Sequence, residues 1–192
     1  MDKTIVLLSG GVDSSLCLLL AHRAGTVEGA LQINYDQPCA TNEREAAAKL
    51  CAELDIERTP MRAYHPGRAA MWLGVGAPGP RVVPGRNLWL LSLAISHAAA
   101  LGANSVTIGC NADDAENYPD CRPEFLAAVS SMAEAAYGVS VKTPLLHMTK
   151  RQVIGAWREL GRNLDETWSC YESTTTKPCG TCNACVLRAE SA

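Results

Sequence analysis

The residues Thr4-Ile5-Val6-Leu7-Leu8, followed directly by Ser9-Gly10-Gly11-Val12-Asp13-Ser14-Ser15, decide the fold of this chain. The apolar run is typical of a strand covered on both faces, as in a parallel sheet. The two glycines allow a sharp turn, and leucines at helical spacing follow over 13–24. A helix starting here points its unpaired amides at the turn, which favours a bound anion such as phosphate. The alternative is an ordinary strand-to-helix turn in which Asp13 or Ser14 caps the helix.

The rest of the chain alternates strand and helix patterns, as expected for an α/β domain with a parallel sheet. The further elements that we predict are strands over 29–35 and 105–110 and helices over 42–54, 88–101, 123–137 and 149–160, the last with Thr149 as its N-cap. Residues 60–84 include five prolines and four glycines, so we expect a mobile loop there. At 192 residues the chain has the size of one domain, which we place at 1–192.

Composition and charge exclude several classes of partner. With 47% hydrophobic residues and 19% charged residues, the chain has the composition of a globular protein. A formal net charge of −3 argues against a nucleic-acid partner or an anionic membrane surface. Met1-Asp2-Lys3 leads straight into the first strand, without the pattern of a secretory signal, and no apolar run has membrane-spanning length. We therefore expect a cytoplasmic protein.

Four thiols near the C-terminus have the spacing of a tetrahedral zinc site: Cys170, Cys179, Cys182 and Cys185. Two of the gaps hold two residues each, and Gly180 permits the tight turn that brings Cys179 and Cys182 onto one metal. Because the protein would supply all four ligands, the zinc is expected to be structural. It would hold the segment 168–188 close to the active site.

The other five of the nine cysteines do not form an obvious set. Cys17, Cys51 and Cys110 lie within apolar patterns and are expected to be small buried residues. Cys39 and Cys121 stand in polar loop contexts, and their role stays open. Without a secretory signal, a reducing compartment and a metal site explain the cysteine content better than disulfide bonds do.

The glycine-rich turn has neither the Walker spacing nor the Rossmann spacing, and it contains no lysine. The complete string Ser9–Ser14 after an apolar strand instead resembles the signature of the PP-loop ATP pyrophosphatases. Those enzymes cleave ATP between the α and β phosphates. The resemblance implies that ATP is bound by the loop: Leu8, Ser9, Gly10, Gly11, Val12, Asp13, Ser14 and Ser15. No partner charge for Asp13 is evident from the sequence, so we expect its carboxylate to help hold Mg²⁺.

Two cations are candidates for contacts with the phosphates. In Val83-Pro84-Gly85-Arg86-Asn87, a rigid turn places Arg86 at the start of a helix, where its guanidinium can clamp a phosphate with two hydrogen bonds. The alternative is a surface arginine, although a cation at a helix N-terminus is mildly unfavourable. Lys150, in the first turn of the last long helix, is a similar candidate whose alternative is a solvent-facing lysine.

Four strings now stand in order: Ser9–Ser14, Val83–Asn87, Tyr118–Phe125, and Thr167–Cys170 with Pro178–Arg188. This set closely resembles the 7-cyano-7-deazaguanine synthase family over essentially the whole chain. The resemblance implies an adenine nucleotide alpha hydrolase-like domain that acts as a homodimer. The implied substrate is 7-carboxy-7-deazaguanine, whose carboxylate is adenylated by ATP. Ammonia then gives an amide, and a second activation followed by loss of the activated oxygen gives the nitrile.

Within this family resemblance, one loop-to-helix junction is expected to contact the deazaguanine. Asp120 or Glu124 would accept its N–H and NH₂ edge, and Arg122 would meet its carboxylate. Phe125 would contact the ring, with a core anchor as the alternative. Two further residues, Asn111 and Asp113, follow a strand end together with Asp114, a position typical of ligand-facing loops and of turn formers. Together with Arg86 and Asn87 these are the expected substrate-binding residues, and we expect catalysis from Asp13, Arg86, Lys150 and Arg122.

One stretch departs from the family pattern. The family's second strand leads into Asp-Tyr-Gly-Gln-Arg-His, whereas residues 34–39 read Asn-Tyr-Asp-Gln-Pro-Cys. Tyr35 and Gln37 are kept, and we expect both to bind the nucleotide. The missing histidine and arginine remove a possible proton shuttle and a phosphate contact. The chain is also short for the family, with the loop around 74–82 compressed.

Three alternatives follow. A related ligase would stop at the amide or pass the adenylated acid to another amine, including one on a protein. A PP-loop tRNA thiolase would need reactive cysteines near the loop and a basic surface, which the sequence does not support. A zinc-ribbon binding module with a vestigial loop is disfavoured by the intact Ser9–Ser14 string.

Overall fold

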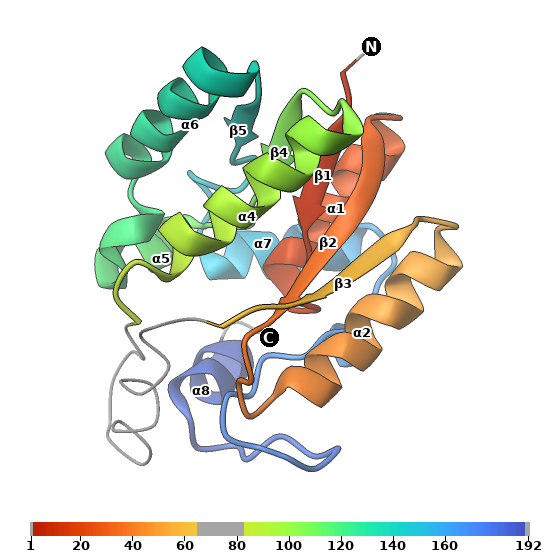
Figure 1. Cartoon of the computed structure of the whole chain (residues 1–192). Helices are drawn as coiled ribbons and strands as arrows, with labels where there is room; N and C mark the ends of the chain where they lie inside the picture. The colour runs from red at the N-terminus through yellow and green to blue at the C-terminus, as the bar shows by residue number, and fades with distance from the viewer. Residues whose placement is uncertain (1, 65–82, 191–192) are drawn as a thin grey trace.

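Five parallel strands form one sheet at the centre of the protein, with the order β3-β2-β1-β4-β5 (Figure 1). The computed structural model describes residues 2–64 and 83–190. The strands are β1 (Thr4–Leu7), β2 (Val27–Asn34), β3 (Arg58–Arg62), β4 (Ser105–Thr107) and β5 (Ser140–Lys142). The parallel α/β architecture with the C-terminal cysteine segment, predicted from the alternating pattern, is confirmed.

Helices connect the strands and cover both faces of the sheet. They are α1 (Val12–Arg23), α2 (Ala40–Glu53), α4 (Arg86–Leu101), α5 (Ala112–Asn117), α6 (Pro123–Tyr137), α7 (Lys150–Glu159) and α8 (Asn183–Glu190), with short 3-10 turns η1 (Pro119–Cys121) and η2 (Leu164–Glu166). The predicted helices agree with these to within two residues at each end. Thr149 caps α7 as predicted, because its hydroxyl accepts the Gln152 N–H at 3.3 Å.

The alternation of side chains along β1 explains why this strand lies in the middle. Ile5 and Leu7 pack into the core under α4 and α6, whereas Val6 and Leu8 pack into the core under α1, α2 and α7. All four residues of the strand are buried. A strand buried on both faces needs this continuous apolar run, which is the pattern of residues 4–8.

Two strands were not predicted from the sequence, and one predicted strand is shorter than expected. The strand expected over 105–110 ends at Thr107. Within the stretch 60–84, the first residues belong to β3, where Pro60 pairs with Gln32. Proline is tolerated because β3 is an edge strand, so the missing N–H faces away from β2. Residues 65–82 of the predicted mobile loop, including the compression around 74–82, lie outside the described residues.

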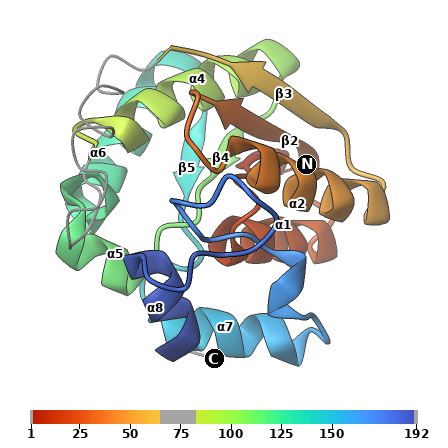
Figure 2. The same ribbon diagram turned by 90° about the horizontal axis from the view of Figure 1, so that it is seen from below.

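The strand order places a crevice at one end of the sheet. From β1 the chain builds β2 and β3 on one side, then crosses to β4 and β5 on the other. Ligands of open parallel sheets bind at this reversal, outside the carboxyl ends of the strands. Figure 2 shows that the segment leading to α8 crosses this end of the molecule, near α1 and α2.

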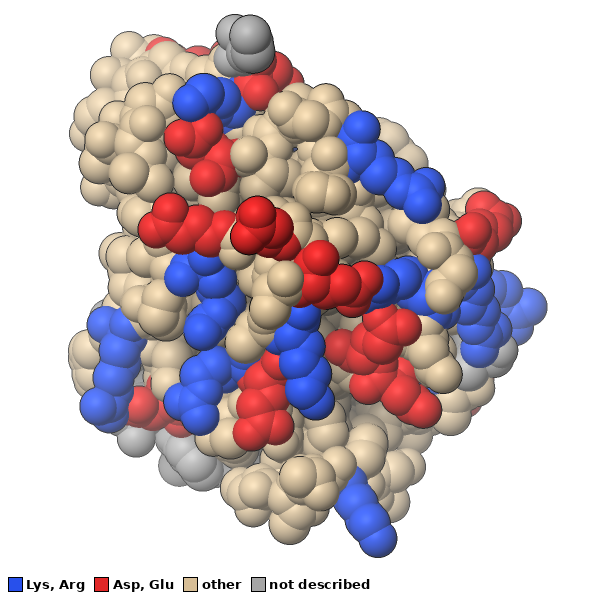
Figure 3. Space-filling view, turned by 90° about the vertical axis from the view of Figure 1, so that its right-hand side faces the viewer, with Lys and Arg blue, Asp and Glu red and all other residues tan. Residues whose placement is uncertain are grey.

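Surface charge on the face that carries β3 and α2 is mixed (Figure 3). Lysine and arginine side chains alternate there with aspartate and glutamate side chains. Ion pairs of this kind include Lys3 with Glu28 at 2.8 Å and Arg162 with Glu166 at 2.6 Å. Within residues 2–64 and 83–190, no helix combines the length and apolar character needed to cross a membrane.

Candidate active site

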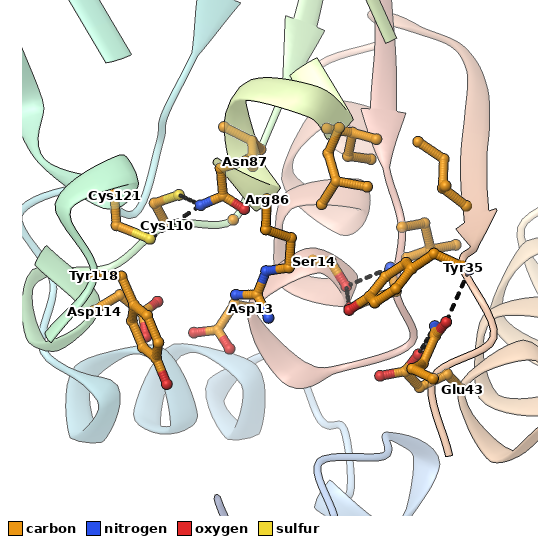
Figure 4. A pocket seen from close by; sticks show the side chains of 18 of the residues that line it. Asp13, Ser14, Tyr35, Glu43, Arg86, Asn87, Cys110, Asp114, Tyr118 and Cys121 are labelled. Carbon is orange, nitrogen blue, oxygen red and sulfur yellow. Dashed lines mark hydrogen bonds between the residues drawn. The ribbon is translucent and has the colours of Figure 1, made fainter. Parts of the chain in front are cut away.

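A cavity of about 250 Å³ opens at the carboxyl ends of β1, β2 and β4, where the strand order reverses. Its walls come from segments that are far apart in the sequence. The phosphate loop contributes Leu8, Ser9, Asp13 and Ser14, and the β2 side contributes Tyr35, Gln37 and Glu43. The β4 side contributes Cys110, Asp114, Tyr118 and Cys121, while Arg86, Asn87, Lys150 and Tyr171 complete the lining. Figure 4 shows the arrangement of these side chains.

The loop between β1 and α1 is held by its own hydroxyl groups. The Ser14 hydroxyl donates to the Gly11 carbonyl at 3.1 Å and accepts the Ser9 N–H at 3.2 Å. The N-cap residue of α1 is Gly11, and among the described residues no side chain caps this helix. The alternative in which Asp13 or Ser14 caps the helix is therefore wrong. The amides of the first turn stay available for an anion.

Gly10 is required at its position for two reasons. Its φ of 90° lies in a region that other residues rarely adopt. A Cβ at this position would also stand 2.4 Å from the Glu43 carbonyl oxygen in α2. The phosphate loop is thus packed against the helix that begins the β2 side of the pocket.

Asp13 has a partner charge that the sequence did not reveal. Its Oδ2 lies 2.5 Å from Lys150 Nζ, and its Oδ1 accepts a hydrogen bond from the Asn111 amide at 2.9 Å. The expectation that Asp13 stands without a partner charge is therefore wrong, because α7 brings Lys150 across the chain to the loop. Burial alone would lower the pKa of Lys150, but the charges of Asp13 and Asp114 outweigh it and raise the pKa. Lys150 is thus a cation inside the pocket.

Arg86 projects into the middle of the pocket from the first turn of α4 (Figure 4). Its guanidinium lies 5.8 Å from the centroid of the Tyr118 ring, and Tyr35 and Tyr171 are its other aromatic neighbours. Burial would lower the pKa of Arg86, but these tyrosines and Asp120 raise it overall. A desolvated arginine that keeps its charge binds phosphate oxygens strongly.

Asn87 joins the start of α4 to the β4 side of the pocket. Its side-chain amide donates to the Asp120 carbonyl at 3.1 Å and contacts the sulfurs of Cys121 and Cys110 at 3.1 and 3.7 Å. Its backbone N–H donates to the Asp120 carboxylate at 2.8 Å, so that Asp120 stabilises the first turn of α4. The expected burial of Cys110 is confirmed, and Cys121 is buried in the same pocket wall.

The β2 side carries a carboxyl group that the sequence analysis missed. Glu43 accepts a hydrogen bond from the Gln37 amide at 2.7 Å, and the Cys39 thiol is a second neighbour. Burial raises the pKa of Glu43, although Gln37, Cys39 and Arg86 counteract this. Gln37 in turn accepts the Tyr35 N–H at 3.0 Å, which fixes the turn after β2. These contacts place Tyr35 and Gln37, the nucleotide-binding candidates of this stretch, in the pocket wall.

Two acidic residues after β4 have different roles: Asp114 faces the pocket, and Asp113 supports the start of α7. Asp114 lines the pocket, and burial together with the charge of Asp13 raises its pKa to about 6. Asp113 accepts the backbone N–H of Lys150 at 2.8 Å. Asn111 is the fully buried N-cap of α5, and its side-chain Oδ1 accepts the Asp114 N–H at 3.0 Å.

The four C-terminal cysteines come together as predicted. One sulfur from each of Cys170, Cys179, Cys182 and Cys185 lies within 4.8 Å of the others, and the Cys179 and Cys185 sulfurs are 4.0 Å apart. A tetrahedral zinc with bonds of about 2.3 Å needs sulfurs about 3.8 Å apart, so this set fits such an ion. Backbone N–H groups of Thr181 and Cys182 lower the pKa of Cys179 to about 6, which favours the thiolate that a metal requires.

A family model described as "Queuosine biosynthesis protein QueC" matches residues 3–68 and 77–192. The chain belongs to this family. A relative from Koribacter versatilis, named 7-cyano-7-deazaguanine synthase, is 38% identical over 97% of this chain and 86% of its own length. A relative of the same name from Thiobacillus denitrificans is also 38% identical, over 97% of this chain and 91% of its own. The resemblance that the four strings indicated is thus confirmed.

Solved structures with much lower identity have the same fold. NMN synthetase from Francisella tularensis superimposes with a TM-score of 0.59 at 19% identity, covering 95% of this chain and 70% of that one. A 4-thiouridine synthetase, solved in an RNA complex with bound ATP, gives a TM-score of 0.55 at 16% identity over 99% of this chain and 49% of its own. This QueC family member therefore has the PP-loop fold that its first loop predicted.

The structure brings only part of the predicted site of the QueC family member into the cavity. Leu8, Ser9, Asp13, Ser14, Tyr35, Gln37, Arg86, Asn87 and Lys150 line it. Gly10, Gly11, Val12 and Ser15 belong to the same loop, with Val12 and Ser15 buried beneath it. Asn111, Asp113 and Asp120 support residues that line the cavity.

From the string Tyr118–Phe125, only Tyr118 and Cys121 line the cavity among the described residues. Arg122 is exposed, with its Nε donating to the Ala115 carbonyl at 3.4 Å, and Glu124 is exposed on the first turn of α6. Phe125 packs against the core under α4 and α6, as its alternative role of core anchor required. Leu126 and Val129 occupy core-facing positions of α6, whereas Glu124 lies on its exposed side.

The pocket lining of this QueC family member also includes Glu43, Tyr118 and Tyr171, which the sequence analysis did not name as site residues. Tyr118 opens the quoted string Tyr118–Phe125, and Tyr171 follows Cys170 directly, so both stood beside residues that the motifs marked. Glu43 lies in a helix rich in alanine and glutamate, where no local signal separates it from its exposed neighbours Arg44 and Glu45. Only the packing of α2 against the loop selects it.

Proposed function

We propose that this QueC family member converts 7-carboxy-7-deazaguanine, ammonia and ATP into 7-cyano-7-deazaguanine. The proposal is carried by the family match, which spans nearly the whole chain. It agrees with the geometry, because the phosphate loop faces the same cavity as Arg86 and Lys150. The relatives named 7-cyano-7-deazaguanine synthase support the product. The bound ATP named for the 4-thiouridine synthetase supports the nucleotide.

The phosphates of ATP would lie at the first turn of α1, where amides and the helix dipole favour anions. Lys150 and Arg86 would neutralise the charge that develops as pyrophosphate leaves. Asp13 and Asp114 face the same cavity and are the carboxylates that would hold Mg²⁺. Adenosine would lie on the side of Tyr35 and Gln37, which leaves the Asn87 and Tyr118 side for the deazaguanine.

The reaction in this arrangement has two activations. A carboxylate oxygen of the substrate attacks the α phosphorus, and the bond to the β phosphate breaks. Ammonia then attacks the acyl carbon, loses a proton and displaces AMP to give the amide. The amide oxygen attacks the α phosphorus of a second ATP and displaces a second pyrophosphate. Departure of AMP, with loss of two protons from nitrogen, then leaves the nitrile. The chain's contribution is to position these groups and to stabilise the phosphate charge.

The four-cysteine cluster would hold a zinc ion in a structural role. All four ligands come from the protein, which is the donor set of closed zinc sites. Bound zinc would stabilise the fold of the segment 168–188, and the thiols would lose their protons on binding.

A second candidate function is a ligase that stops at the amide or transfers the adenylated acid to another amine. The observation in its favour is the stretch 34–39, where proline and cysteine replace the arginine and histidine of the family pattern. Cys39 is buried beside Glu43, and burial raises the pKa of its thiol, so it does not replace a histidine as a proton carrier.

The deciding experiment is a mass-resolved assay with zinc-loaded protein, 7-carboxy-7-deazaguanine, Mg²⁺-ATP and ammonium. We expect the nitrile, together with AMP and pyrophosphate. Amide alone, or adenylated acid that reacts only with an added amine, would establish the second candidate instead. Absence of any adenylation would contradict both. The Lys150→Met variant is the matched control, because it should keep its zinc and lose adenylation.

A further inference from the structure

Tyr171 stands next to a metal ligand in the sequence and inside the nucleotide pocket in space. The preceding residue, Cys170, belongs to the four-cysteine cluster and is buried. Tyr171 lines the cavity, where Arg86 and Tyr118 are its neighbours. The cysteine cluster therefore supplies part of the pocket wall.

A second contact joins the tail to the phosphate loop itself. The Trp168 backbone N–H donates to the Gly10 carbonyl at 2.8 Å, and the Trp168 carbonyl lies 3.4 Å from where a Cβ on Gly11 would be. The Trp168 indole N–H donates to the Cys170 carbonyl at 2.8 Å. The backbone just before the cluster is thus fastened to the loop that receives the phosphates.

A third contact joins the tail to α2, which carries Glu43. The buried Asn42 amide donates to the carbonyl groups of Thr175 at 2.9 Å and Ser173 at 3.4 Å. Both carbonyls lie in the connection between Cys170 and Cys179. The tail therefore contributes Tyr171 to the pocket wall and contacts both the phosphate loop, through Trp168, and α2, through Ser173 and Thr175.

We propose that Tyr171 couples the cysteine cluster to the nucleotide pocket, so that zinc and ATP each strengthen the binding of the other. The inference rests on the proposed function, because it takes ATP as the ligand of the pocket and zinc as the ligand of the cluster. Zinc bound by Cys170 fixes the backbone that positions Tyr171 against Arg86. A nucleotide that contacts this wall must stabilise the same backbone, because coupling between two sites is reciprocal.

The test measures zinc release from the loaded full chain into an excess of a chromogenic chelator. Release is compared with and without α,β-methylene ATP saturated with Mg²⁺, an analogue that cannot be cleaved between the α and β phosphorus atoms. We expect the analogue to slow zinc release about tenfold. In Tyr171→Ala the rate should be the same with and without the analogue. Tyr137→Ala, which alters a 67% exposed tyrosine on α6, should keep the full protection.

A second measurement tests the same coupling from the side of the nucleotide. It uses the parent protein alone, so it does not depend on whether Tyr171→Ala keeps its zinc during purification. Equilibrium dialysis gives the dissociation constant of the analogue for zinc-loaded and zinc-free parent protein, and we expect about tenfold weaker binding without zinc. Bound analogue with unchanged zinc release would overturn the coupling and leave the ATP proposal intact. Equal protection in Tyr171→Ala would overturn the role of this residue. Failure of the zinc-loaded parent to bind the analogue would overturn both.

Discussion

The phosphate loop and the cysteine segment both border the pocket, but different interactions hold them in place. The loop over 9–15 is continuous with a buried strand and a buried helix, and its hydroxyl groups hydrogen-bond within the loop. The segment over 168–190 has no strand, and its exposed residues outnumber its buried ones. Its four sulfurs converge instead on one point. The core shapes the loop, whereas the tail depends on the ion that its cysteines would bind.

This difference has a consequence for stability. A loop that is part of the core keeps its shape as long as the sheet is folded. A tail whose ligands must be deprotonated and gathered around an ion gains its stability from binding. Changes in the loop should therefore affect chemistry or the whole fold, and changes in the tail should affect the pocket while the sheet persists.

The largest expected effect is on the loop side. Asp13→Asn removes the charge that faces Lys150 at 2.5 Å and one of the proposed Mg²⁺ ligands. We expect kcat/KM for adenylation to fall about 10³-fold. Pyrophosphate release measures this, with zinc content unchanged. Glu124→Gln, at an exposed acid outside the pocket lining, should stay within about twofold of the parent; a similar loss there would show that the two acids had been assigned wrongly.

Removal of zinc is the corresponding change on the tail side. Chelation, or Cys182→Ser, should lower adenylation about 10²-fold, because Trp168 and Tyr171 would no longer be held at the pocket. Far-ultraviolet circular dichroism should change little, since the sheet does not depend on the tail. Thr174→Ala, at an exposed position of the same segment, is the control and should be silent. Full activity after complete chelation would refute the structural role of the metal.

A pair of glycine substitutions compares the two regions directly. Gly10 and Gly180 both have positive φ, 90° and 75°. At Gly10 a Cβ would meet the Glu43 carbonyl oxygen at 2.4 Å, whereas nothing lies within 4 Å of a Cβ at Gly180. We expect Gly10→Ala to lower the free energy of unfolding by roughly 3 kcal/mol and Gly180→Ala by about 1 kcal/mol. Urea unfolding of the zinc-loaded variants measures both changes. Equal losses of unfolding free energy would show that the close approach of Gly10 to the Glu43 carbonyl does not constrain the loop.

The smallest effect concerns pH on the loop side. The pKa of Asp114 is raised to about 6, so its carboxyl group becomes neutral as the pH falls through this value. A neutral carboxyl is a poor Mg²⁺ ligand. We therefore expect the Mg²⁺ concentration needed for half-maximal adenylation to rise about tenfold per pH unit below about pH 6. The zinc content should be followed in parallel, and a Mg²⁺ requirement independent of pH would remove Asp114 from the metal site.

The elements that the sequence predicted well are those with a continuous local signal. The apolar run of residues 4–8 and the two glycines after it lie within a few positions of each other, so the whole signal is local. The structure has the strand, turn and helix at these positions. The cysteine spacing is similar, because a metal site constrains residue type and separation together. Proline and glycine content misled the interpretation of 60–62 alone, because Pro60 is compatible with an edge strand and only the sheet order shows that β3 is one.

The residues of the candidate site also fall into two groups, those with a local signal in the sequence and those without one. Ser9, Asp13, Arg86 and Lys150 were named because they lie in segments where glycine, proline or a capping residue marks a turn, and the cysteines were named for their spacing. Tertiary packing alone decided the rest. It paired Asp13 with Lys150 across 137 positions, buried Glu43 beside Gln37, turned Arg122 and Glu124 to the surface, and set Tyr171 against Arg86. Such pairings depend on how parallel strands bring their carboxyl ends to one edge, which no local pattern records.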